Sequence, residues 1–227
     1  MTQDYSLFFI RHGKLLLPYK DHSEIPIEVL ADLATLRLNP PIAKEFTKEQ
    51  ILQLAENIPL QDVRKIYASP SKRCQDTADL IGKYIVENHG RRVEIVTSSE
   101  LREVYFELTK IYPLRGKRDF SIDSINDAVL QAMVNSNENC ESIHSAYKRV
   151  DDFFSSVIPK ESSLFVTHDF LMRVIEIYIK HGRTPRHIIT YNELKNTQRN
   201  TYLHGFATNL AFDNFLALQK LPAKTDD

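Results

Sequence analysis

SLFFIRHG, at residues 6–13, is the stretch from which the fold of this 227-residue chain can be predicted. Its apolar run at 7–10 is continuous and is closed by Gly13, which favours a central strand buried on both faces of a parallel sheet. The later stretch SLFVTHD, at residues 163–169, contains a second short apolar run. Each stretch has a histidine just after its apolar run. We therefore expect two strands that each carry an imidazole beyond their carboxyl ends.

The two histidines, His12 and His168, are expected to share one crevice. Ligands of an open parallel sheet bind beyond the carboxyl ends of its strands, so two neighbouring strands would deliver both imidazoles to the same place. Arg11 would accompany His12 there, and Gly13 would let the backbone turn tightly against a bound anion. This is a spatial prediction about residues that are far apart in the sequence.

The rest of the chain alternates predicted strands with predicted helices, the pattern of an α/β protein with a mainly parallel sheet. Weaker strands are expected at residues 63–68 and 93–96. Helices are expected after a capping-box pattern at 47–50, after an N-cap at Ser69 with Pro70 as the first helical residue, over 141–157, and from His168 to a stop at Gly182. A hairpin is expected at 206–218.

Two stretches fit this pattern poorly. Residues 14–46 contain four prolines, so we expect a loop near the site with a short helix. Residues 101–139 are polar and are interpreted as an insertion that covers one end of the sheet. The length predicts one domain over residues 1–227, with an insertion or cap around 101–140. The tail from Leu221 onward is expected to fray.

Composition and charge exclude several classes of function. The net charge is −1 and the pI is near 6.7, so nothing attracts the whole chain to nucleic acid or to an anionic membrane. The first residues lack a basic region, and charges break the later apolar runs, so neither a signal peptide nor a membrane span is expected. Cys74 and Cys140 are expected to be buried thiols of a reduced compartment. We expect a cytoplasmic protein without nucleic-acid or membrane partners, and the oligomeric state stays open.

A third part of the expected site is the segment SPSKR at residues 69–73. Arg73 lies in the first turn of a predicted helix, where free N–H groups and the helix dipole favour an anion. Its planar guanidinium matches phosphate oxygens. A lone histidine after a strand is more often a structural hydrogen-bonding residue, and such an arginine usually pairs with a carboxylate. Together, however, two arginines, two histidines and a helix N-terminus predict a site for a tetrahedral dianion.

These residues stand in the order of a known family. Arg11-His12-Gly13 after an apolar strand resembles the signature of the histidine phosphatase superfamily, which includes the cofactor-dependent phosphoglycerate mutases. Further similar blocks lie at residues 67–78, 100–103, 141–142, 164–168 and 206–218. The resemblance covers most of the chain and implies a phosphoglycerate mutase-like fold, with three αβα layers and a mainly parallel central sheet.

The resemblance also implies a mechanism. His12 would attack the phosphorus atom and form a phosphohistidine. Arg11, Arg73 and His168 would hold the equatorial oxygens, where charge gathers in the transition state. Glu103 would protonate the leaving oxygen and later deprotonate water. Because nearby arginines lower a carboxyl pKa, this acid must be partly desolvated or placed off the phosphate.

Several residues near the expected site have more than one interpretation. Glu100 and Glu107 are alternatives to Glu103 as the acid. Lys14 follows the Arg-His-Gly signature where the family usually has an acidic or amide residue; it could contact an anionic substrate or be a solvated loop residue. Asp169 replaces the glycine that usually follows the second histidine. Three basic residues could recognise a second acidic group or form a solvated surface: Arg115, Lys117 and Arg118.

The leading hypothesis is a metal-independent phosphomonoesterase that needs no cofactor and acts on a small phosphorylated substrate or a phosphoprotein. A mutase would use the same residues but must exclude water, and the modest covering segment after Leu101 favours hydrolysis. A metallohydrolase built on His12 and His168 lacks a supporting metal-binding spacing, and two arginines would repel a cation. A non-catalytic anion-binding module is the remaining alternative, supported by Lys14 and Asp169.

Overall fold

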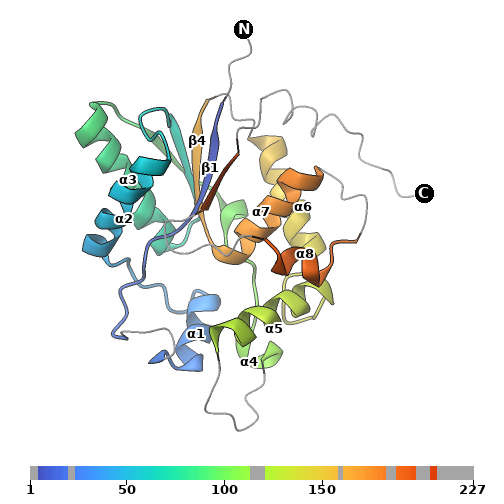
Figure 1. Cartoon of the computed structure of the whole chain (residues 1–227). Helices are drawn as coiled ribbons and strands as arrows, with labels where there is room; N and C mark the ends of the chain where they lie inside the picture. The colour runs from blue at the N-terminus through green and yellow to red at the C-terminus, as the bar shows by residue number, and fades with distance from the viewer. Residues whose placement is uncertain are drawn as a thin grey trace.

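The computed structural model describes residues 5–19, 24–112, 121–157, 161–182 and 188–197, and the backbone of 205–208. These residues form a central sheet with helices on both faces and further helices at one edge (Figure 1). The strands are β1 (Leu7–Arg11), β2 (Lys65–Ala68), β3 (Glu94–Thr97), β4 (Ser163–Thr167) and β5 (Gly205–Thr208). The predicted α/β class, with three layers and a mainly parallel sheet, is confirmed.

The strand order places the two histidine-bearing strands next to each other. The order across the sheet is β3-β2-β4-β1-β5; the first four strands are parallel, and β5 is antiparallel to β1. Leu7 pairs with Ser163 and Arg11 with Thr167, so β1 and β4 end at the same level. Whatever follows these two strands must therefore emerge side by side.

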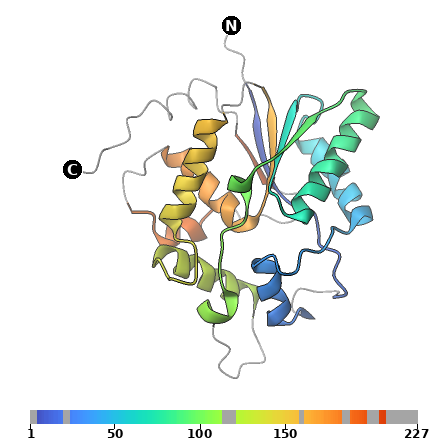
Figure 2. The ribbon, with the colours of Figure 1, turned by 180° about the vertical axis from the view of Figure 1, so that it is seen from behind.

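Both faces of β1 are buried, which is why its sequence is a continuous apolar run. The helices that cover the sheet are α2 (Lys44–Asn57), α3 (Lys72–His89), α6 (Ile143–Ser156) and α7 (Asp169–His181). Successive side chains point to opposite faces: Phe8 and Ile10 belong to the core under α2 and α3, whereas Leu7 and Phe9 belong to the core under α6 and α7. Figures 1 and 2 show the two helix pairs on opposite sides of the sheet.

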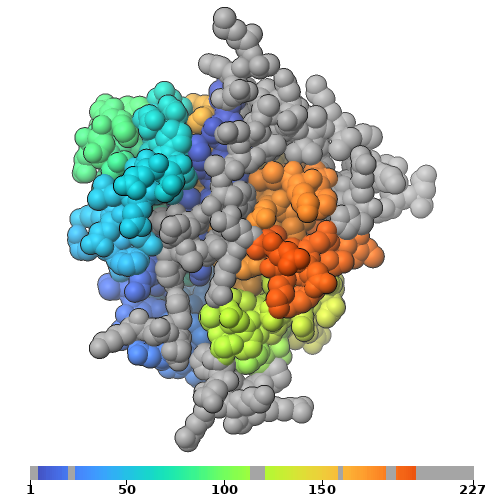
Figure 3. All heavy atoms as spheres, in the orientation of Figure 1, coloured from blue at the N-terminus to red at the C-terminus, as the bar shows by residue number. Residues whose placement is uncertain are grey.

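Further helices lie beyond the carboxyl ends of the strands. They are α1 (Ile27–Ala34), α4 (Leu108–Ile111) and α5 (Ile122–Val134), with the short η2 (Ser99–Leu101) and α8 (Tyr191–Lys195). Helix α1 packs against α4, and α4 packs against α5. The space-filling view shows α8, in orange, lying against α5, in yellow-green (Figure 3). Residues 14–46 and 101–139, which have little regular sequence pattern, thus contribute helices to this edge of the sheet.

The predicted start of α2 is wrong. The helix begins at Lys44, so Thr47 lies inside its first turn and is not the N-cap. The Thr47 hydroxyl donates back to the carbonyl of Ala43 at 2.9 Å. A Cβ placed on Gly13 would lie within 2.8 Å of the Thr47 side chain. Tertiary packing of Thr47 against the residue after His12 therefore overrides the local capping pattern.

The predicted start of α3 is wrong as well, because it lies two residues before the observed start. The helix begins at Lys72 with Ser71 at the N-cap, so Pro70 precedes the helix and does not open it. The predicted end of α7 is confirmed. Gly90 ends α3 in the left-handed conformation, with φ of 64°, and Gly182 follows the last residue of α7.

Some predictions fall outside the described residues. They are the basic residues Arg115, Lys117 and Arg118, the tail from Leu221, and the part of the expected hairpin after residue 208. Cys74 and Cys140 are free and buried, as predicted. Within the described residues, no helix combines the length and apolar character needed to cross a membrane.

Candidate active site

His12 and His168 lie side by side beyond the carboxyl ends of β1 and β4. Their ring centroids are 5.2 Å apart and their planes are inclined by 65°. The backbone N–H of His12 donates to the carbonyl of Thr167 at 3.0 Å, which continues the β1–β4 pairing by one residue. Both histidines are buried. The predicted proximity of the two imidazoles is confirmed, but His12 lines the adjacent pocket and His168 is not among its lining residues.

The backbone determines which nitrogen of His12 carries the proton. His12 Nδ1 lies 2.8 Å from the carbonyl oxygen of Gly13. A carbonyl can only accept, so Nδ1 is the donor and Nε2 is unprotonated in the neutral ring. Burial lowers the pKa of His12 well below its usual value, and the charges of Arg73 and Arg11 lower it further. At neutral pH the ring is therefore uncharged and has a lone pair on Nε2.

His168 is held between Arg73 and the loop that precedes α3. The Nε and Nη2 atoms of Arg73 lie 3.4 and 3.3 Å from His168 Nδ1. Because a guanidinium only donates, Nδ1 accepts and Nε2 carries the proton, which points to the hydroxyl oxygen of Ser69 at 2.9 Å. Burial, followed by the charge of Arg73, lowers the pKa of His168 well below its usual value. His168 is thus neutral and its orientation is set from both sides.

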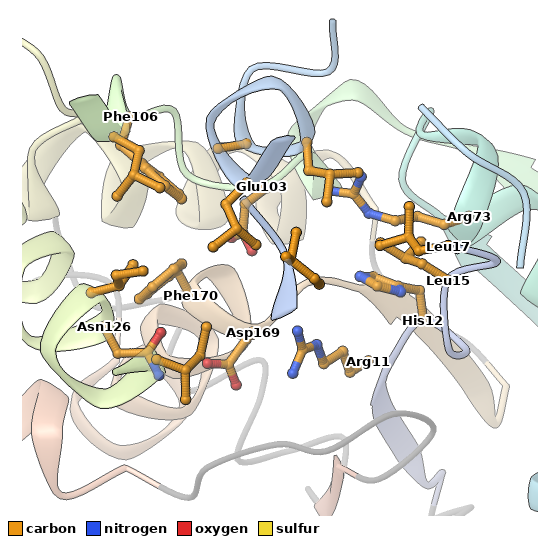
Figure 4. Close-up of a pocket in the computed structure, with 17 residues that line it drawn as sticks. Arg11, His12, Leu15, Leu17, Arg73, Glu103, Phe106, Asn126, Asp169 and Phe170 are labelled. Atoms are coloured by element: carbon orange, nitrogen blue, oxygen red, sulfur yellow. The ribbon is translucent and has the colours of Figure 1, made fainter. Parts of the chain in front are cut away.

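The two predicted arginines reach the same pocket as His12. Arg73 lies in the first turn of α3, and its side chain is buried. Arg11 is the last residue of β1. Figure 4 shows Arg11, His12 and Arg73 together at one side of the pocket, which we call the cationic end. Neither arginine is turned away into solvent, so the arrangement matches the expected site for a dianion.

Gly13 and Lys14, which were expected to bind substrate, have other contacts. The Gly13 N–H donates to the Thr77 hydroxyl at 2.9 Å, and its missing side chain leaves room for Thr47 of α2. Its small size therefore serves packing against a helix. The Lys14 ammonium lies 5.0 Å from the centroid of the Phe46 ring, and Lys14 does not line the pocket.

Glu103 lies between the cationic end and the rest of the pocket (Figure 4). Its Oε1 accepts from the backbone N–H of Val104 at 2.9 Å and from that of Leu171, in the first turn of α7, at 3.1 Å. Burial raises the pKa of Glu103 to about 7, against the lowering effects of these hydrogen bonds and of Arg73. A carboxyl in this position can both release and take up a proton near neutral pH.

The two alternative acids lie elsewhere. Glu100 accepts from the Ser98 hydroxyl at 2.6 Å, which lowers the pKa of Glu100. Glu107 pairs with Lys110 at 2.7 Å, which lowers the pKa of Glu107. Neither residue lines the pocket. Position and protonation thus both favour Glu103 over its two neighbours.

Comparison with known proteins places the chain in a family. The profile of the histidine phosphatase superfamily (branch 1) matches residues 7–202. The chain belongs to the histidine phosphatase superfamily. The chain has no match among curated protein sequences.

Solved structures share the fold of this superfamily member. Bacillus stearothermophilus YhfR matches with a TM-score of 0.54 and 17% identity over 87% of each chain. A mycobacterial glucosyl-3-phosphoglycerate phosphatase, solved with VO3, gives 0.55 and 15% over 86% of this chain and 87% of its own. The phosphoserine phosphatase of Entamoeba histolytica, in complex with 3-phosphoglyceric acid, gives 0.51 and 15% over 86% and 85%.

In this histidine phosphatase superfamily member, the loop that carries Glu103 is anchored from two sides. The buried side chain of Arg149, on α6, donates through Nη1 to the carbonyl of Arg102 at 2.9 Å. The Thr167 hydroxyl, at the end of β4, donates to the carbonyl of Leu101 at 2.6 Å. No local pattern in the sequence points to Arg149 or Thr167, because their role depends on tertiary contacts. Both would have been assigned to ordinary helix and strand positions.

Asp169, where the family usually has glycine, is held by a neighbouring charge. Its carboxylate lies 3.3 Å from Arg173 on the next turn of α7, and both side chains are buried. Arg173 also donates to the carbonyl of Leu194 and the hydroxyl of Thr197, both at 3.2 Å. Asp169 lines the pocket, but its negative charge is offset by this arginine. The departure from the family pattern therefore leaves the cationic end intact.

The pocket itself has a volume of about 210 Å³. Its cationic end is polar, and most of its remaining walls are apolar. Among the residues that the structure describes, no group of three or more metal-binding side chains is arranged to hold a metal ion. The groups at the cationic end can bind an anion, supply a neutral imidazole nitrogen and exchange one proton through Glu103.

Proposed function

We propose that the protein is a metal-independent phosphatase that hydrolyses a phosphate monoester through a phosphohistidine on His12. One observation carries the proposal. The neutral imidazole of His12, with Nε2 unprotonated, borders a pocket together with two guanidiniums and a carboxyl whose pKa is about 7. These groups would supply the nucleophile, the anion ligands and the acid that a two-step phosphoryl transfer requires.

In the first step, the lone pair of His12 Nε2 attacks phosphorus and the bond to the ester oxygen breaks. Glu103 gives its proton to that oxygen, which leaves as an alcohol. Arg11 and Arg73 offset the charge that gathers on the equatorial oxygens. His168, which contacts Ser69 and Arg73 through its two ring nitrogens, orients the Arg73 guanidinium. The products of the step are the alcohol, a phosphohistidine and the Glu103 carboxylate.

In the second step, water attacks the phosphohistidine. The Glu103 carboxylate takes a proton from the water as its oxygen bonds to phosphorus, and the bond to Nε2 breaks. The electron pair returns to His12, inorganic phosphate leaves, and Glu103 is protonated again. A carboxyl with a pKa near 7 serves both directions of this exchange, because it is partly protonated at neutral pH.

The proposal extends to the organisation of the chain. We take residues 1–227 as one domain in which the segment 101–140 acts as a cap, since its helices α4 and α5 stand over the pocket edge with α1. The free, buried state of both cysteines supports a reduced, cytoplasmic location. A small phosphorylated compound suits the pocket volume better than a folded phosphoprotein.

Hydrolysis of p-nitrophenyl phosphate tests the proposal. Wild type should release p-nitrophenol in the presence of EDTA and form a phosphoenzyme that is labile in acid and stable in base. The His12→Ala variant should do neither, whereas His144→Ala, at an exposed histidine, should behave like wild type. Three results would reject the proposal: loss of activity with the chelator, transfer of phosphate to an acceptor in place of water, or inertness of wild type toward every ester tried.

A further inference from the structure

The pocket beyond the cationic end is enclosed by apolar side chains. We call this set the apolar wall: Leu30, Leu33, Phe106, Leu108, Ile125 and Phe170. In Figure 4, Phe106 and Phe170 lie across the pocket from the cationic end, with Glu103 between the two regions. A group bonded to the phosphate oxygen next to Glu103 would therefore extend toward the apolar wall.

The apolar wall is assembled from three separate segments of the chain, the last of which is α7 with Phe170. Leu30 and Leu33 belong to α1, whereas Leu108 begins α4 and Ile125 lies in α5. Helix α1 packs on α4, and α4 on α5, so the packing of these helices closes the pocket. Most of these side chains also pack in the hydrophobic core, and the rings of Phe106 and Phe170 meet edge to face with centroids 5.5 Å apart. The surface that they turn to the pocket is available for contact with a bound apolar group.

The described lining offers little to a second charged group on the substrate. Apart from the residues at the cationic end, its charged members are Glu103 and Asp169, and the latter is neutralised by Arg173 at 3.3 Å. Asn126 adds one neutral amide. Beyond the cationic end, a second carboxylate or phosphate on the substrate would have to leave water without a cation of the described lining to pair with, which is costly.

We infer, on the basis of the proposed function, that the group esterified to phosphate in the substrate is an uncharged, mainly apolar alcohol, with about the bulk of one aromatic ring or a short alkyl chain. The volume supports this size. A cavity of about 150 Å³ lined by Leu, Ile and Phe admits benzene, and the present pocket holds about 210 Å³ in which the phosphate must also fit. The described part of the pocket lining therefore disfavours an acidic substrate such as a phosphoglycerate.

A series of n-alkyl phosphates from ethyl to hexyl tests this inference by hydrolysis. The alcohols released have almost equal acidity, so changes in kcat/KM report contact with the pocket and not the strength of the leaving group. We expect kcat/KM to rise about fourfold per methylene, the equivalent of about 0.8 kcal/mol for burying a CH₂ group, until the pocket is full. Glycerol 3-phosphate and 3-phosphoglycerate should react at least about tenfold more slowly than butyl phosphate.

Two leucines supply a matched pair of variants. Leu30 belongs to the apolar wall, whereas Leu16 does not line the pocket and is 60% exposed. Leu30→Gln should reduce the gain in kcat/KM per methylene to less than twofold, and Leu16→Gln should keep the wild-type gain. The same gain in kcat/KM per methylene in wild type and both variants would refute the apolar substrate class, and so would a preference of wild type for 3-phosphoglycerate. Either result would leave the phosphatase activity established.

Binding of n-alkyl phosphonates, which carry no hydrolysable ester bond, separates this inference from the proposed function. Calorimetry should show tighter binding and a more negative heat-capacity change as the chain lengthens. This result together with a wild-type enzyme that hydrolyses no ester would support the apolar pocket and reject the phosphatase. Affinity that is independent of chain length would reject the apolar pocket, whatever the activity.

Discussion

Arg149 donates from Nε and Nη2 to the two carboxylate oxygens of Glu141, at 3.0 and 2.7 Å, and both side chains are buried. Its third nitrogen donates to the backbone carbonyls of Glu100 and Arg102. The ion pair therefore joins α6 to the loop that ends at Glu103. Since Glu103 is the proposed acid, a pair of residues outside the pocket determines where that acid lies.

Replacement of Arg149 by lysine should impair catalysis more than binding. Lysine keeps the charge but cannot hold both the carboxylate and the loop carbonyls, because it lacks the planar fork. We expect kcat for butyl phosphate to fall at least about tenfold with little change in the Kd of inorganic phosphate. The control is Lys148→Arg, at the exposed neighbouring position, which should match wild type. A change in phosphate affinity as large as the change in kcat would argue against a positioning role.

Removal of one partner of the pair should destabilise the fold. Arg149→Met removes the close partner of the buried Glu141 carboxylate and leaves it the longer ion pair with Arg102 at 3.7 Å, so the loss should approach that of a broken buried pair, about 3–5 kcal/mol. The double variant Arg149→Met, Glu141→Met should lose less than the sum of the single losses, as read from urea unfolding curves. Additive losses would show that the two side chains act independently.

The pH dependence of hydrolysis should follow Glu103. Its raised pKa, about 7, means that the acid is protonated below pH 7 and is lost above it. For butyl phosphate, kcat/KM should therefore fall about tenfold per pH unit above pH 7. Glu103→Gln should abolish this fall of kcat/KM with pH and lower the rate by about 10²–10⁴-fold. The loss should be much smaller with p-nitrophenyl phosphate, whose leaving group needs no proton, and equal losses would contradict the assignment.

Ionisation of Glu103 should also lower the free energy of unfolding at alkaline pH. Its folded pKa of about 7 lies above its ordinary value of 4.5, so the favourable contribution is complete below pH 4.5 and is lost as the pH rises through 7. At about 1.4 kcal/mol per pH unit between the two values, the loss reaches at most about 3 kcal/mol. Glu103→Gln should therefore be more stable than wild type at pH 9, and the difference should shrink at pH 5. Denaturant unfolding of wild type and Glu103→Gln at pH 9 and at pH 5 measures the two differences in stability.

Gly13→Ala should disturb packing against α2. The new methyl group would lie 2.7 Å from Thr47 Oγ1 and 2.8 Å from Thr47 Cγ2, so the helix must move. We expect a loss of about 1–3 kcal/mol in unfolding free energy. Thr47→Ala in the same chain should restore part of it, because it removes both contacting atoms. No rescue by the second substitution would show that Gly13 is required for a reason other than space.

The sequence predicted the centre of the site better than its surroundings. The strands that carry His12 and His168 were predictable because strands buried on both faces have a continuous apolar run. The start of α2 was not predictable, because Thr47 is used for a tertiary contact and its capping signal is local. The roles of Arg149 and Thr167 depend on backbone carbonyls of a distant loop. No pattern in the sequence predicts such a distant partner.

The apolar wall was equally hidden. Leu30 lies in a proline-rich stretch and Ile125 in a polar one, and neither stretch has a pattern that points to a pocket. Only the packing of α1 on α4 and of α4 on α5 brings these residues together. Prediction from the sequence therefore identified the groups that could do chemistry and missed those that would select the substrate.

The position of β1 in the sheet has a consequence for biosynthesis. Its two neighbours, β4 and β5, both follow β2 and β3 in the sequence, so during translation β1 has no partner until the chain has been extended as far as β4. Such long-range pairing is slow, and a nascent chain must shield LFFI from aggregation in the meantime. His12, the proposed nucleophile, therefore reaches its working surroundings long after it has been synthesised.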